Sequence, residues 1–151
     1  MADATRSKTT VRLLSGNCLR MTAASAMEHG EAVVKNSSAA STTGHAPAAL
    51  ADQDAQATAD FIGFVVDHAP NEGGDYDVAS GETIDVSQDG AIVRGWTDLT
   101  PGTVYFLSGN PGEICPYSDL ITGDWVTQVG VGWSATDLLQ KTGTLPVAAK
   151  A

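Results

Sequence analysis

GETIDVSQDGAIVRGWTDLTPGTVYFLSGNPGEICPYSDLITGDWVTQVGVGW, residues 81–133, decides the fold because its short apolar runs are separated by explicit turn signals. Asp89-Gly90 is a residue pair that tight hairpins prefer, since both residue types tolerate positive φ. Thr100-Pro101-Gly102-Thr103 and Asn110-Pro111-Gly112-Glu113 place Pro and Gly at the two central positions of a type II turn. These signals predict short strands joined by tight turns.

The runs between the turns have the two-residue period of β-strands. Residues 83–87 alternate, and residues 104–107 are aromatic or β-branched apart from Leu107. Between residues 124 and 133, every second side chain falls on one face: Trp125, Thr127, Val129, Val131 and Trp133. We therefore predict an all-β protein, a small β-barrel or β-sandwich with short hairpins and little helix.

Other segments extend this pattern. Residues 11–14 and 18–21 are typical of two short strands around a turn, or of one kinked strand. The continuous apolar run at residues 61–66 predicts a strand that is buried on both faces. Residues 134–140 are expected to form a turn and an edge strand, and a helix at residues 53–59 stays open.

The length is that of one domain, which can bury a core without a disulfide or metal framework. Residues 1–10 have no apolar periodicity, so we expect an extended N-terminal arm over residues 1–25. A single β domain follows over residues 26–145, with a flexible tail at 146–151. The residues expected in the core or at a subunit interface are Trp125, Val129, Val131, Trp133, Phe61 and Phe64.

Charge is distributed unevenly along the chain, whose net charge is −10. Residues 1–20 contain Arg6, Lys8, Arg12 and Arg20 against Asp3 alone. The rest of the chain is strongly acidic, which disfavours nucleic acid as a partner, whereas the basic leading segment suits an acidic protein surface. No apolar stretch reaches the roughly 18 residues of a membrane span, and no export signal is recognised, so we expect a soluble protein.

Titratable and nucleophilic residues are scattered. Cys18 and Cys115 lie far apart without a CxxC motif, which predicts two free, buried thiols. His29, His45 and His68 accompany no nucleophile motif, and the GxSxG, HExxH and Gly-rich phosphate signatures do not occur. We therefore assign the histidines surface roles and expect no enzymatic activity.

One loop has oxygen ligands around a glycine bend. Residues 71–77, NEGGDYD, follow Asp67 and would suit Ca²⁺ by ligand type. The spacing differs from that of a known calcium loop, and acidic side chains are expected in exposed loops of an acidic chain. The sequence therefore predicts neither a metal nor a cofactor.

A series of segments carries a resemblance to a known family. They are GEAVV (30–34), ALAD (49–52), ATADFIGFV (57–65), GETIDV (81–86), GAIVRG (90–95), LTPGTVYFLS (99–108) and GDWVTQVGV (123–131). In this order, over roughly residues 30–140, they resemble bacteriophage capsid decoration proteins, also called cement or head-stabilising proteins. The same β-module is seen in phage head and tail fibres.

The resemblance implies a homotrimer on the outer surface of the icosahedral capsid, where it bridges neighbouring major capsid proteins. Such a protein is made in the host cytoplasm, is localised to the virion and has no catalytic motif. The residues before 30 lie outside the resemblance, so charge alone suggests that Arg6, Lys8, Arg12 and Arg20 bind the capsid.

The alternative is a fibre module that binds a host receptor or glycan through exposed aromatics such as Trp96, Tyr76 or Tyr117. A small hydrolase is a third possibility, for which no motif argues.

Overall fold

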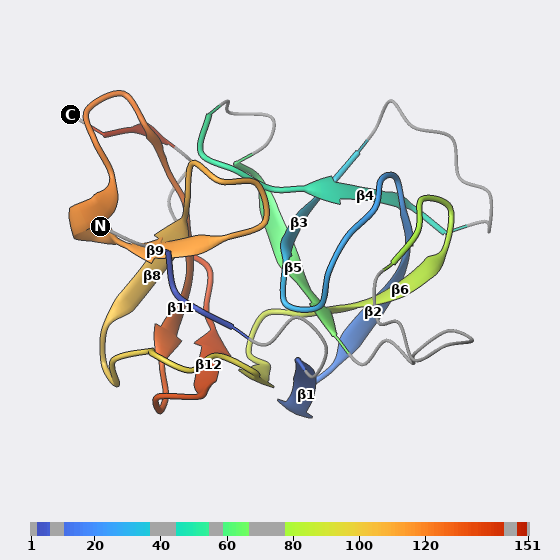
Figure 1. Ribbon diagram of the computed structural model, residues 1–151, viewed down its shortest axis with the longest axis horizontal. Helices are drawn as coiled ribbons and strands as arrows, with labels where there is room; N and C mark the ends of the chain where they lie inside the picture. Colours follow the sequence, from blue (N-terminus) through green and yellow to red (C-terminus); the bar gives the residue numbers. More distant parts are fainter. Residues whose placement is uncertain are drawn as a thin grey trace.

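Two β-structures make up most of the computed structural model, which describes residues 3–6, 11–36, 45–54, 59–66, 78–143 and 148–150 (Figure 1). A closed five-stranded barrel has the order β2-β4-β3-β5-β6. A six-stranded antiparallel sheet has the order β1-β7-β12-β11-β8-β9. The all-β prediction is confirmed.

The barrel strands are β2 (Cys18–Ala23), β3 (Ala32–Lys35), β4 (Pro47–Leu50), β5 (Phe61–Val66) and β6 (Thr83–Ser87). The sheet strands are β1 (Arg12–Ser15), β7 (Ile92–Arg94), β8 (Val104–Leu107), β9 (Ile114–Pro116), β11 (Gln128–Gly132) and β12 (Asp137–Gln140). A short 3₁₀ turn, η2 (Tyr117–Asp119), follows β9, and β10 (Trp125–Val126) pairs with β13 (Ala148–Ala149).

The two Pro-Gly turns form as the sequence predicts. Thr103 N–H donates to the carbonyl of Thr100 at 3.1 Å, and Gly102 has a φ of 82°. Glu113 N–H donates to the carbonyl of Asn110 at 3.0 Å, with a φ of 83° at Gly112. Proline sets the first central residue, and glycine accepts the positive φ of the second.

The Asp89-Gly90 turn also forms, with Gly90 at a φ of 89°, but it makes no hairpin. It carries the chain from β6 of the barrel to β7 of the sheet. The turn at Gly16 likewise joins β1 of the sheet to β2 of the barrel, and β1 pairs with β7 while β2 pairs with β6. The two turns are stacked so closely that a Cβ on Gly16 would lie 2.7 Å from Cα of Ala91. A shared corner therefore replaces the expected hairpin.

Two clusters of buried side chains hold the barrel and the sheet. One lies between them and includes Phe64, whose ring contacts those of Trp96 and Phe61 edge-on at centroid distances of 5.2 and 5.0 Å. The other lies within the barrel and includes Val65 and Ile84. Because neighbouring residues of β5 enter different clusters, this strand is buried on both faces, which confirms the prediction.

The residues expected to form an arm belong instead to the fold wherever the structure describes them. β1 and β2 lie within residues 1–25, and Val11 is buried. Residues 3–6, which we call the N-terminal strap, run along the sheet, where Ala4 N–H donates to the carbonyl of Ile114 at 2.9 Å. At the other end, β13 pairs with β10, so residues 148–150 are not a free tail. Backbone pairing holds both ends.

The run 124–133, expected as one strand, is divided between β10 and β11. The register shifts between Gln128 and Gly130, a bulge at Val129. An extra residue reverses the alternation, so Val129 is buried whereas Val131 is half-buried and Trp133 is 61 % exposed. Residues 137–140, expected at an edge, form β12 in the interior of the sheet.

Candidate functional site

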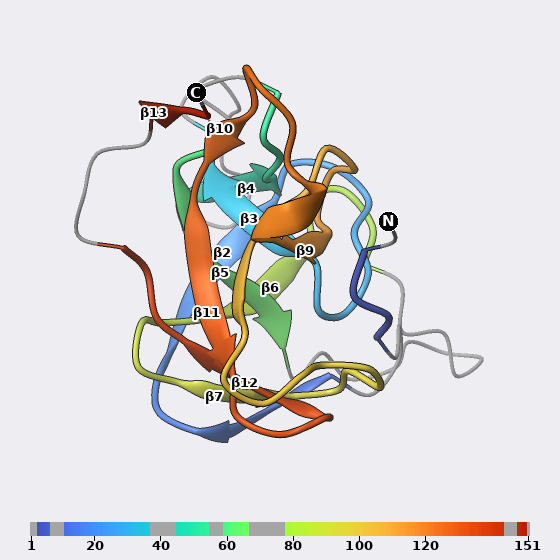
Figure 2. The same ribbon diagram turned by 90° about the vertical axis from the view of Figure 1, so that its left-hand side faces the viewer.

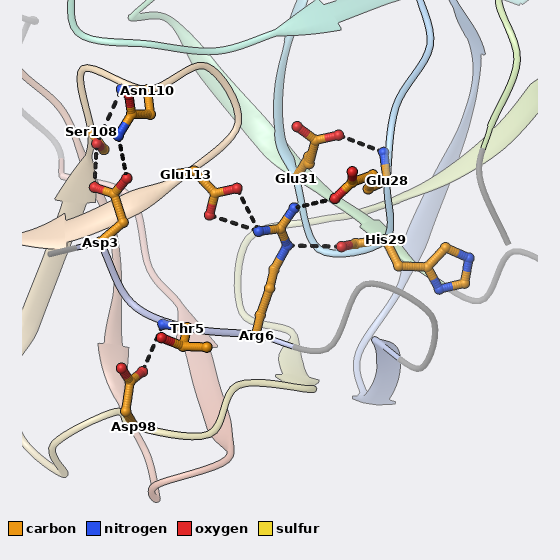
Figure 3. Close-up of polar contacts among 10 residues, drawn as sticks. All are labelled: Asp3, Thr5, Arg6, Glu28, His29, Glu31, Asp98, Ser108, Asn110 and Glu113. Atoms are coloured by element: carbon orange, nitrogen blue, oxygen red, sulfur yellow. Dashed lines mark hydrogen bonds and ion pairs between the residues drawn. The ribbon is translucent and has the colours of Figure 1, made fainter.

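The guanidinium of Arg6 joins the sheet to the barrel in a buried ion-pair network (Figure 3). Its Nη1 donates to both carboxylate oxygens of Glu113, each at 2.6 Å, and its Nε donates to the carbonyl of His29 at 2.8 Å. Nη2 lies 3.6 Å from a carboxylate oxygen of Glu28. The Arg6 side chain is 3 % exposed. Arg6 therefore cannot offer its charge to a partner, contrary to the expected capsid-binding role.

The rest of the N-terminal strap is held by charge-assisted hydrogen bonds. The carboxylate of Asp3 accepts from the Ser108 hydroxyl and, at 2.6 Å, from the amide of Asn110. Thr5 N–H donates to the Asp98 carboxylate at 2.8 Å. Hydrogen bonds to ionised groups are stronger than neutral ones. The strap thus ties the β7–β8 and β8–β9 connections to the barrel.

Glu31 is the titratable group at this junction whose pKa is shifted most. Its carboxylate is buried beside Gly112, and it accepts the N–H of Glu28 at 2.5 Å. Burial raises the pKa of Glu31 to about 7, assisted by the carboxylates of Glu28 and Glu113 and opposed by the Glu28 N–H and by Arg6. The junction therefore holds a carboxyl group that titrates near neutral pH.

The remaining cations of the expected arm lie on two different surfaces. Arg20, on β2 of the barrel, pairs with Asp85 at 3.2 Å. Arg12, on β1 of the sheet, is exposed and lies directly opposite Arg94, and it has no ion-pair partner within the described chain. Lys8 lies outside the described residues. Because β1 and β2 enter different sheets and Arg6 is buried, the three described cations do not form one site.

The expected core and interface residues also separate. Phe61, Phe64 and Val129 are buried in the core, and Trp125 packs against it. Val131 and Trp133 lie on the opposite side of the six-stranded sheet, which we call the outer face. Figure 2 shows β11 of this sheet in front of the barrel strands β2 and β5.

The outer face carries further residues that the sequence analysis did not single out. Ile92, Leu139, Val131 and Val104 are paired in register across β7, β12, β11 and β8. Next to this apolar row, Arg94 Nε donates to the Asp137 carboxylate at 2.7 Å, which lowers the pKa of Asp137. The sequence did indicate an apolar outer face, because these strands carry apolar residues at both odd and even positions and therefore on both sides of the sheet.

Several smaller expectations have clear outcomes. Both cysteines are free, as predicted, but Cys18 is exposed and only Cys115 is buried. Burial raises the pKa of the Cys115 thiol to about 12. His29 is buried rather than at the surface.

Of the aromatic residues considered for glycan binding, Trp96 is buried and Tyr117 is 49 % exposed. Tyr76, His68 and the possible calcium loop at 67–77 lie outside the described residues.

Comparison with known proteins adds no relative. No protein-family model matches the chain, and no curated protein matches it. Within its described ranges, the chain has no group of three or more potential metal ligands. No helix among the described residues is long and apolar enough to span a membrane.

Proposed function

We propose that this protein is a non-enzymatic structural component of a phage virion, which decorates the outer surface of the icosahedral capsid and bridges neighbouring major capsid proteins as a homotrimer. The observation that carries the proposal is the ordered resemblance over residues 30–140, a stretch whose described parts supply most strands of the barrel and of the six-stranded sheet. The family implies binding rather than catalysis.

The β1–β2 corner offers a surface for the capsid contact. From residue 12 to residue 20 every residue is exposed except the half-buried Leu13. On the barrel side of the corner, Leu19 is 40 % exposed next to Arg20. An apolar side chain beside a cation is suited to the surface of another protein, and linked contacts from three copies would strengthen a weak individual grip by avidity.

Undecorated heads of the source phage provide the test. The wild-type protein is expected to saturate the heads. The double variant Leu19→Ser, Arg20→Glu is expected to need at least about a tenfold higher protein concentration for the same occupancy. Lys35→Glu, an exposed charge reversal elsewhere on the barrel, is the control. Occupancy is measured by sedimentation of heads and by cryo-electron microscopy. If the wild-type protein does not bind the heads, the proposal is overturned.

A fibre module that binds glycans is the second candidate, favoured by the exposure of Trp133 (61 %) and Tyr117 (49 %). Exposed aromatic rings are suited to stacking against sugars. This candidate predicts that the purified protein adheres to host cells or polysaccharide, and that Trp133→Ala or Tyr117→Ala abolishes adhesion. Equal adhesion of both variants and wild type would reject these aromatics as the binding site.

A further inference from the structure

The outer face of the six-stranded sheet is more apolar than expected for a surface that contacts only solvent. An antiparallel sheet with one face on the core normally alternates apolar residues inward with polar residues outward. Here the outward row consists of Ile92, Leu139, Val131 and Val104, all only partly buried. Four apolar side chains paired in register form a continuous stripe rather than scattered exposed residues.

Aromatic residues extend the stripe. Phe106 lies two residues beyond Val104 on β8, and its ring contacts Tyr117 edge-on at a centroid distance of 5.5 Å. Trp133 lies two residues beyond Val131, and its N–H donates to the carbonyl of Asp137. Aromatic side chains that combine a large apolar area with partial exposure are typical of protein interfaces.

The charge of the six-stranded sheet is opposite to that of the rest of the described chain. The charged residues within its six strands are Arg12, Arg94 and Asp137, two cations and one carboxylate. The other described residues hold five cations and thirteen carboxylates. Arg94 has Asp137 as its partner, whereas Arg12 lies against a like charge and has no acceptor within the described residues. Two opposed cations are unfavourable unless another carboxylate approaches them.

We propose that the outer face binds a second copy of this chain, head to tail, so that the basic and apolar face of one copy lies on the acidic surface of the next. Two outer faces set against each other would bring their arginine pairs together, whereas the rest of the chain supplies many carboxylates. A head-to-tail contact generates a ring when its rotation closes. The inference deepens the proposed function, on which the role of the ring as a decoration trimer rests.

Sedimentation velocity of the purified protein tests the contact over a range of concentrations. The wild type is expected to assemble, and Arg12→Glu and Trp133→Ser are each expected to raise the dissociation constant at least about tenfold. The matched controls, Lys35→Glu and Leu19→Ser, make the same kinds of change away from the outer face and are expected to assemble as the wild type does. High salt is expected to weaken the wild-type assembly.

Thermal unfolding, at a concentration low enough for the wild type to be monomeric, separates a lost interface from a lost fold. Arg12→Glu replaces one of two opposed cations, so its monomer is expected to unfold at the temperature of the wild-type monomer or above. A wild type that stays monomeric at millimolar concentration, or variants that assemble as well as their controls, would overturn the inference.

The outcome is separable from that of the proposed function. A monomer that nevertheless binds heads would overturn the contact between copies and leave decoration standing. If the protein assembles in a way that depends on Arg12 and Trp133 but does not bind heads, the contact between copies is supported and the proposed capsid-decorating function is overturned.

Discussion

Replacing Glu31 by Gln should change how the stability of this protein depends on pH. The pKa of Glu31 is raised from 4.5 to about 7, chiefly by burial. A carboxyl group whose pKa is higher in the folded state binds its proton more tightly there than in the unfolded chain. Its stabilising contribution is therefore complete below pH 4.5 and is lost as pH rises through about 7.

The size of the effect follows from the shift. The full difference corresponds to about 3 kcal/mol, at about 1.4 kcal/mol for each pKa unit. Solvent that reaches the carboxyl group reduces this to about 1–3 kcal/mol. Glutamine keeps the acceptor for the N–H of Glu28 and carries no charge at any pH. Relative to the wild type, Glu31→Gln should therefore gain about 1–3 kcal/mol between pH 5 and pH 9.

Guanidinium unfolding at one-unit steps from pH 5 to pH 9 measures this difference. Asp54→Asn, which removes a carboxylate from an exposed position, is the control and should show a nearly constant difference from the wild type. If the free-energy difference between Glu31→Gln and the wild type is the same at pH 5 and pH 9, Glu31 is not protonated in the fold at neutral pH, and the reasoning from burial is refuted.

Three further predictions concern the junction, the corner and the buried thiol. Arg6→Met leaves the partly exposed carboxylates of Glu113 and Glu28 without their partner and should cost about 1.5–3 kcal/mol in urea unfolding, against at most about 1 kcal/mol for Arg20→Met at an exposed pair; equal costs would contradict the junction. Gly16→Ala should cost more than Gly90→Ala in the same assay, because both positions have positive φ but only Gly16 meets a neighbour, so equal losses would count against the stacked corner. Cys115 should resist iodoacetamide at pH 8 in the native protein and react after denaturation, as followed by mass spectrometry; rapid native labelling would disprove its burial.

The N-terminal strap shows why a basic segment need not be a free arm. Arg6 lies in a polar stretch without apolar periodicity, and its charge alone suggested an external partner. Its carboxylate partner, Glu113, is 107 residues away in the sequence. Buried arginine is acceptable here because Nη1 donates to the Glu113 carboxylate, Nε donates to the His29 carbonyl, and Nη2 lies 3.6 Å from a carboxylate oxygen of Glu28.

Local chemistry was sufficient for the strand class and the turns. In Thr100-Pro101-Gly102-Thr103, proline restricts one φ and glycine supplies the positive φ of the next residue, so the turn depends on four adjacent residues. The apolar run of β5 likewise indicated burial on both faces without knowledge of its neighbours. Such features are determined within a few residues of the chain.

The placement of surfaces was decided only by the tertiary structure. The sequence by itself determined a chain of short β-strands with an acidic body, but not that β1 and β2 enter different sheets or that Arg6 is enclosed. A single extra residue at Val129 moved Val131 and Trp133 from the expected inward side to the outer face. The physical reason is that strand pairing between distant segments sets the register, and a shift of one residue exchanges the two faces of a strand.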